Sequence, residues 1–142
     1  MRNLYTPILV THVLIAVLGL GSIASVALVA ASARRDGNST DASRSIGLLL
    51  RYSGLSLVTM LITGILLDVA SGGAFRGAWW FRGSAILLLA TGVLLGQARR
   101  ALRSVGQGDG REVTLRRVER IAYGMCAFLA AITVLMEVKP FR

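Results

Sequence analysis

Residues 4–31 of this chain have the sequence LYTPILVTHVLIAVLGLGSIASVALVAA, an apolar run without Asp, Glu, Lys or Arg. Roughly 20 helical residues cross the hydrocarbon core of a bilayer, so the run is long enough to span a membrane. Strands of a membrane barrel alternate polar and apolar residues, and this run does not, which favours a helix. The stretch 31–33 (Ala-Ser-Ala) has the form of a signal-peptide cleavage site, but the run is well past the ~7–15 apolar residues of a signal peptide. We therefore expect a retained membrane helix.

Three further apolar segments follow the first, at about residues 46–69, 79–98 and 118–138. The polar segments between the four spans are short and occupy residues 33–45, 70–78 and 101–117. Short connections make neighbouring helices antiparallel. The sequence therefore predicts an all-α membrane protein, in which residues 1–142 form one transmembrane domain built as an antiparallel up-down four-helix bundle.

The composition excludes most classes of soluble enzyme. Of the 142 residues, 54% are hydrophobic and 16% are charged, whereas about 25% of the residues of a soluble domain are charged. The single cysteine excludes an internal disulfide, and the single histidine excludes HExxH and other multi-histidine metal sites. The sequence also contains no Gly-rich phosphate loop and no GxSxG motif. The shortage of catalytic motifs favours a non-enzymatic role.

The net charge of +9 is distributed unevenly along the chain. Eleven of the 16 basic residues lie in or beside the first and third polar segments, and five lie elsewhere. The positive-inside rule then predicts that both of these segments are cytoplasmic and that both termini lie outside. Because this asymmetry accounts for most of the charge, we expect no nucleic-acid partner. The expected partner is the lipid bilayer, whose anionic headgroups attract arginine-rich loops.

Each predicted helix carries one face of small or polar residues at helical spacing. Small residues let membrane helices approach closely, so we expect these faces to look into the bundle, either as ordinary helix contacts or as the lining of a cavity. The glycine pair of the third helix has the GxxxG spacing of close helix contacts. The four faces are Tyr5, His12, Ala16, Gly19, Ala27 and Ala30; Tyr52, Ser56, Thr59 and Thr63; Ala85, Leu88, Gly92 and Gly96; and Tyr123, Ala127, Ala130 and Glu137, flanked by Cys126 and Thr133.

His12 is the ionisable residue expected deepest in the membrane, where such groups are costly and raise a functional hypothesis. One interpretation is a neutral imidazole bonded to a hydroxyl such as Thr59, Thr63 or Thr133. The other is an axial haem or metal ligand, or a group that accepts a proton. The residues leave both interpretations open.

Other charged side chains are expected near the ends of the spans. Arg51 either snorkels to the cytoplasmic edge or pairs with Glu119. At the opposite edge we expect Asp68, Arg82 and Glu137 to share a layer, with Arg82 bridging the two acids and lowering the cost of burying them.

Aromatic and sulfur-containing residues suggest an interfacial anchor and a candidate copper site. Residues 79–81 (Trp-Trp-Phe) are typical of an interfacial anchor. Thioethers and thiols suit Cu(I), and the chain has Met60, Met125, Cys126 and Met136. These residues form no tight repeated pair, and adjacent Met125 and Cys126 face different directions on a helix. We therefore expect core residues and no metal site.

Four short stretches occur in an order found in a known group of proteins. The first is His12 followed by Gly19 and Gly21, and the second is a segment that has Arg51 near its start and Thr63-Gly64 near its end. The third is the stretch Trp79–Arg82, and the fourth is the ending Val138-Lys139-Pro140-Phe141. In this order the chain resembles small four-helix bacterial membrane proteins that include the haem-b-containing protoporphyrinogen oxidase and the copper-resistance-D-like proteins.

The resemblance implies a location in a bacterial inner (plasma) membrane. It also implies that haem b is a cofactor, that His12 is its axial ligand, and that Arg82 is at a basic position suited to a haem propionate or an acid partner. One histidine per chain gives a bis-histidine site only if two chains share it.

Two functions follow from these observations. The first is a non-enzymatic integral membrane protein that acts as an accessory or packing subunit, in a homo-oligomer or with a partner in a larger membrane complex. The alternative is a haem-b-binding membrane redox protein that resembles the protoporphyrinogen oxidase, with His12 as axial ligand. A transporter is a third alternative, although the sequence shows no internal repeat.

Overall fold

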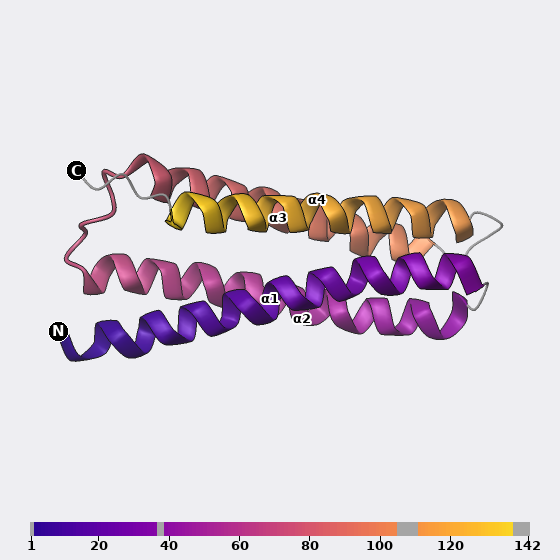
Figure 1. The fold of residues 1–142 in the computed structure, drawn as a ribbon, viewed down its shortest axis with the longest axis horizontal. Helices are drawn as coiled ribbons and strands as arrows, with labels where there is room; N and C mark the ends of the chain where they lie inside the picture. Colours follow the sequence, from indigo (N-terminus) through magenta and orange to yellow (C-terminus); the bar gives the residue numbers. More distant parts are fainter. Residues whose placement is uncertain (1, 37–38, 105–110, 138–142) are drawn as a thin grey trace.

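The computed structural model of the chain describes residues 2–36, 39–104 and 111–137. They form four α-helices: α1 (Arg2–Asp36), α2 (Ser39–Ala70), α3 (Trp79–Ser104) and α4 (Arg111–Glu137). The helices run side by side along the long axis of the molecule, and both chain termini lie at the same end (Figure 1). The described residues contain no strand. The predicted all-α four-helix bundle is confirmed.

Each helix is long and apolar enough to cross a membrane. The candidate spans are Leu4–Arg35, Ala42–Ala70, Trp79–Arg103 and Glu112–Glu137. Such helices keep their backbone hydrogen bonds within one segment, as lipid requires. The chain is therefore a multi-pass integral membrane protein.

The loops at one end of the bundle are shorter than predicted. We expected residues 33–45 and 101–117 to be loops, but helices cover all of these residues except 37–38 and 105–110, which lie outside the described part. Their alanines and arginines are good helix formers, so the helices continue beyond the apolar spans. The ending at residues 138–141 also lies outside the described residues.

The second connection, at residues 70–78, is confirmed as a tight turn. Helix α2 ends at Ala70 and α3 begins at Trp79. Gly72 and Gly73 have φ values of 76° and 79°, a left-handed conformation that side chains with a Cβ rarely adopt. The backbone amide of Gly73 donates to the carbonyl of Asp68 at 2.8 Å, which closes the end of α2.

The helices form two hairpins, α1–α2 and α3–α4, which meet chiefly where α1 packs on α4. Of the four pairs of neighbouring helices, α2 and α3 make the least extensive contact. The apolar core is concentrated between the middle of the bundle and the end away from the termini, where α1 is buried from Ile23 onward. The fully buried side chains of this core include Ile23, Val26, Ile46, Leu50, Val118 and Met125.

Two of the four predicted inward faces are largely confirmed. On α1, His12, Gly19, Ala27 and Ala30 are buried. On α2, Thr63 is buried and Ser56 and Thr59 are half-buried, whereas the side chain of Tyr52 is 66% exposed and faces outward, against the prediction.

The predictions for α3 and α4 are wrong in their main features. Gly92 is exposed, and a Cβ on Gly92 or Gly96 would meet no atom within 4 Å. Tyr123, Ala127 and Ala130 are exposed as well. The buried face of α4 consists instead of Leu115, Val118, Ala122, Met125, Leu129 and Ile132. Because lipid is as apolar as leucine, hydrophobicity does not decide which face of a membrane helix is buried, and here the larger side chains fill the seam.

Candidate functional site

His12 lies three turns into α1 and faces the interior of the bundle, with 7% of its surface exposed. Its Nδ1 is 2.7 Å from Oγ1 of Thr63 on α2. Of the three hydroxyls that the sequence offered as partners, the structure therefore selects Thr63. The expected contact of His12 with a hydroxyl is therefore present.

Thr63 also lies close to two carbonyl oxygens of its own helix: its Oγ1 is 2.9 Å from the carbonyl oxygen of Thr59 and 3.1 Å from that of Met60. Carbonyl oxygens only accept, so a Thr63 hydroxyl that gives its one hydrogen to either of them accepts a hydrogen bond from His12. In this arrangement Nδ1 of His12 carries the proton and Nε2 has a free lone pair, the state in which imidazole binds a metal.

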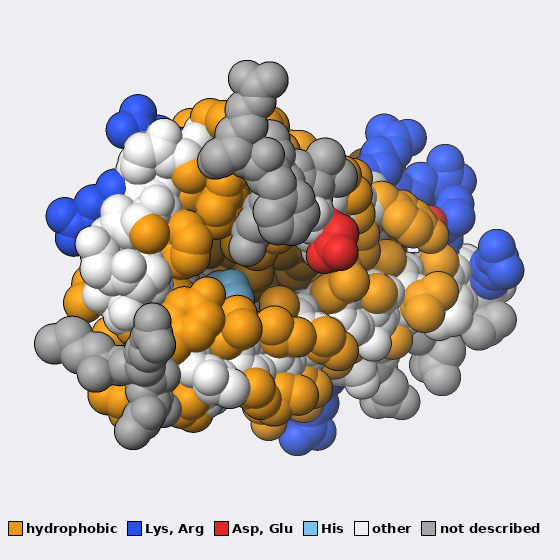
Figure 2. Space-filling view, turned by 60° about the vertical axis from the view of Figure 1, so that its left-hand side comes forward, with side chains coloured by type: hydrophobic (Ala, Val, Ile, Leu, Met, Phe, Trp, Pro, Cys, Tyr) orange, Lys and Arg blue, Asp and Glu red, His pale blue; other side chains and the backbone are white. Residues whose placement is uncertain are grey.

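Two cavities adjoin His12. One, of about 280 Å³, lies mainly between α2 and α3; the other, of about 360 Å³, lies between α1 and α4. His12, Met60 and Met136 line both of them. Figure 2 shows the chain's one histidine at the bottom of a hollow walled by hydrophobic side chains. Mostly apolar walls with few polar groups are typical of small-molecule sites, and these volumes are near the lower end of that class.

Ser84 adds a polar group to the cavity between α2 and α3. Its side chain is buried and lines this cavity, and its Oγ has no hydrogen-bond partner among the described residues. A buried hydroxyl without a partner costs about 1–3 kcal/mol. Ser84 is therefore a buried hydroxyl without a partner among the described residues, in the wall of an otherwise apolar cavity.

The sulfur-containing residues divide into two groups. Met125 is fully buried in the core and Cys126 is half-buried, as ordinary core residues would be. Met60 and Met136 instead line the cavities with His12. No local sequence pattern indicates this grouping, because these residues are far apart in the chain. No group of three or more His, Cys, Asp or Glu side chains able to hold a metal ion occurs among the described residues.

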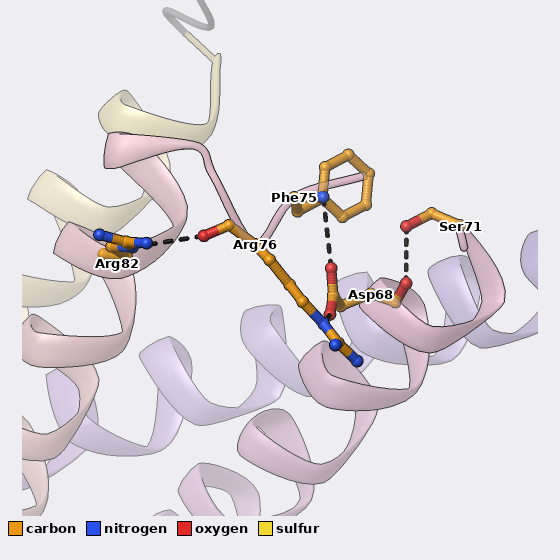
Figure 3. A network of polar contacts seen from close by, with 5 residues as sticks. All are labelled: Asp68, Ser71, Phe75, Arg76 and Arg82. Carbon is orange, nitrogen blue, oxygen red and sulfur yellow. Dashed lines mark hydrogen bonds and ion pairs between the residues drawn. The ribbon is translucent and has the colours of Figure 1, made fainter. Parts of the chain in front are cut away.

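The charged layer near the termini differs from the prediction. Asp68 is buried, but its partner is Arg76, whose Nε lies 3.1 Å from Oδ2. The backbone amide of Phe75 donates to Oδ1 at 3.2 Å. Arg82 points to the turn and donates to the carbonyl of Arg76 at 3.3 Å (Figure 3). The turn folds back over the end of α2, so Arg76 reaches Asp68, and the bridge from Arg82 to Asp68 and Glu137 is not formed.

Of the two alternatives for Arg51, the ion pair with Glu119 is not formed. Glu119 is paired with Arg34, whose Nε lies 3.4 Å from Oε2. Glu119 and Arg34 belong to α4 and α1, which pack against each other. Arg51 is exposed, as the alternative of a snorkelling side chain requires.

Phe75, Trp80 and Phe81 form an aromatic cluster at the start of α3. Ring centroids of Phe75 and Trp80 lie 5.4 Å apart, and those of Trp80 and Phe81 lie 6.1 Å apart in an edge-on arrangement. Trp79 is exposed, as an interfacial anchor requires. Phe81 also lines the cavity beside His12. The predicted anchor therefore also contributes a wall of the site.

The residues at the cavities fit a haem in donor chemistry. His12 offers an imidazole nitrogen, Met60 and Met136 offer thioethers, and the walls are apolar. Histidine with methionine is one of the axial ligand sets that proteins use for haem iron. Arg82, the suggested partner of a propionate, is exposed and is not among the residues lining either cavity.

Comparison of the chain with protein-family models, with curated proteins and with solved structures finds no match.

Proposed function

We propose that this integral membrane protein binds an apolar ligand through Nε2 of His12, and that haem b is the ligand that the site suits best. The observation that carries the proposal is the contact of Nδ1 with Thr63, because an Nδ1 that donates there leaves Nε2 with a free lone pair on a ring that lines two apolar cavities. A purely structural histidine requires no cavity beside its ring. The methionines at the same cavities supply candidate second ligands.

Bound haem would supply one-electron redox chemistry. The contribution of the chain is then to orient the imidazole through Thr63, to exclude water with apolar walls and to hold the ligand between the two hairpins. The role that follows is a haem-binding membrane redox protein, which we infer from the site chemistry.

Absorption spectroscopy of the purified protein tests this proposal. We expect a Soret band after titration with hemin in detergent, and its loss in His12→Ala. Cys126→Ser is the matched control. A cysteine thiolate is a haem ligand in other proteins, but Cys126 does not line either cavity, so we expect the band to persist. An unchanged band and affinity in His12→Ala would remove His12 as the ligand.

A second candidate role, that of a packing subunit in a larger membrane complex or homo-oligomer, has separate support. Gly92, Ala127 and Ala130 are exposed on α3 and α4, and a Cβ on Gly92 would meet no atom of the described residues within 4 Å. Small residues exposed to lipid allow another helix to approach closely. Gly92→Leu is expected to weaken assembly in a cross-linking experiment. Assembly that is unchanged in this variant would contradict this role for the α3 surface.

For the membrane orientation we propose, from the charge asymmetry, that both termini lie outside and that the basic end is cytoplasmic, in a bacterial inner membrane. Cysteines at exposed Ala74 and Val113, in a Cys126→Ser background, report on the two ends. An impermeant reagent added outside should label Ala74→Cys and spare Val113→Cys. The opposite pattern would reverse the orientation.

A further inference from the structure

A third cavity, of about 320 Å³, lies between α2 and α3 toward the basic end of the bundle. These two helices make less extensive contact than the other pairs of neighbouring helices do. Its lining consists of Gly47, Leu50 and Arg51 from α2 and Arg99, Leu102 and Arg103 from α3. Half of these residues are arginines, so the cavity combines apolar walls with a high positive charge.

Arg99 is fixed in this cavity by the backbone of α2. Its Nη2 donates to the carbonyl oxygen of Leu50 at 2.8 Å. The guanidinium passes directly over Gly54, where a Cβ would overlap Nη2 and lie 3.2 Å from Cζ. Any larger residue at position 54 would therefore push Arg99 away from the carbonyl.

A second nitrogen of Arg99 lacks an acceptor. Its Nε is buried and has no hydrogen-bond partner among the described residues. Buried polar groups in proteins are nearly always hydrogen-bonded, and those that are not point to an ion or a ligand. A guanidinium has five N–H donors in a fixed fork, which matches the oxygens of a phosphate.

The two glutamates at this end whose side chains the structure describes do not balance the charges of these arginines. Glu112 is paired with Arg116 at 2.9 Å, and Glu119 forms an ion pair with Arg34 at 3.4 Å. No ion pair involving Arg51, Arg99 or Arg103 occurs among the described residues. Three like charges around one cavity repel each other, and an anion between them would remove that repulsion.

The depth of the cavity in the bilayer indicates whether a lipid headgroup can supply the anion. Arg99 lies four residues inside the end of its candidate span at Arg103, which is about 6 Å along a helix. Arg51 lies nine residues inside the start of its span at Ala42, about 13 Å along the helix. Leu50 and Leu102 complete the lining with apolar surface. A site at this depth is accessible from the headgroup layer of the bilayer.

From these observations we propose that the cavity between α2 and α3 binds a phosphoryl group, supplied by the headgroup of an anionic phospholipid. Arg99 is the fixed ligand, and Arg51 and Arg103 close on the phosphate from the two helices. This site is separate from the His12 cavities and does not depend on haem binding.

Thermal unfolding of the delipidated protein in detergent, with phosphatidylglycerol titrated into the micelles, tests the proposal. We expect phosphatidylglycerol to raise the Tm at lower concentration than phosphatidylcholine does. Arg51→Gln and Arg103→Gln should each raise the half-maximal concentration about fivefold, which corresponds to about 1 kcal/mol per arginine near a membrane surface. Both variants keep the bond from Arg99 to Leu50, so folding is preserved. Arg99→Gln should have the largest effect.

Arg100→Gln is the matched control, because Arg100 is exposed, follows Arg99 on α3 and does not line the cavity. We expect it to change the half-maximal concentration less than twofold. An equal shift in Arg100→Gln and Arg103→Gln, or an equal effect of the two lipids, would overturn the site in favour of diffuse attraction. Inorganic phosphate that raises the Tm with the same dependence on the variants would support the phosphoryl site and identify the free ion as its source.

Discussion

The two hairpins of the bundle have seams of different chemistry. Between α1 and α2, three polar contacts cross from one helix to the other: His12 with Thr63, Ser22 with Ser53 at 2.8 Å, and the hydroxyl of Ser56 with the carbonyl of Ile15 at 2.9 Å. Between α3 and α4, Thr91 and Thr133 donate only to carbonyls of their own helices.

The difference shows two ways of packing helices in lipid. Hydrogen bonds across a seam fix the register of α1 on α2, and Gly19 permits the close approach that they need, since a Cβ there would lie 2.7 Å from Oγ of Ser56. The seam of α3 and α4 depends on the fit of large apolar side chains, among them Leu95, Val118 and Met125. The polar seam therefore contains the site at His12, while the apolar seam leaves the small residues of its helices facing lipid.

The largest effect is expected from adding bulk to the polar seam. Gly19→Leu would force α1 away from α2, and overpacking costs about 1–3 kcal/mol in the free energy of unfolding. Gly92→Leu adds the same side chain where no atom lies within 4 Å of the new Cβ, so its effect on the monomer should be close to zero. The Tm of the two variants in detergent measures the contrast. Equal losses would mean that Gly92 also lies in a helix contact.

A smaller effect is expected from removing one hydroxyl in each hairpin. Thr63→Val leaves Nδ1 of His12 without a partner and should cost about 0.6–1.7 kcal/mol, the range for hydrogen bonds between membrane helices. Thr91→Val makes the same change at a fully buried position whose hydroxyl bonds only within α3. We expect almost no loss of stability there. If denaturant unfolding gave equal losses, the contrast between the seams would be wrong.

The sequence predicted the parts of this fold that depend on the chain's own composition. The four apolar spans, the turn at residues 70–78 and the inward face of α1 follow from hydropathy and helical spacing. The α1 face was correctly predicted because a histidine and several small residues coincide on it. The face of α4 was not, because Ala127 and Ala130 on one side and Met125 and Leu129 on the other are equally compatible with lipid.

The site was only partly predictable for a different reason. His12 and its hydroxyl partner were candidates from the sequence, but the choice of Thr63 depends on the register of α1 on α2. Met60 on α2 and Met136 on α4 line the same cavity as His12 on α1, and this depends on how the three helices pack. The partner of Asp68 depends on how the turn folds back, which places Arg76 where Arg82 was expected.

The protonation of His12 tests the central claim most directly, because this is the only histidine of the chain. The ¹⁵N spectrum of the protein labelled in the histidine ring, recorded in detergent at neutral pH without haem, reports which nitrogen carries the hydrogen. We predict a protonated Nδ1 and an unprotonated Nε2, with the preference weakened in Thr63→Val. A hydrogen on Nε2 in the wild-type protein would contradict the claim, because that nitrogen would then be a donor without the free lone pair that ligand binding requires.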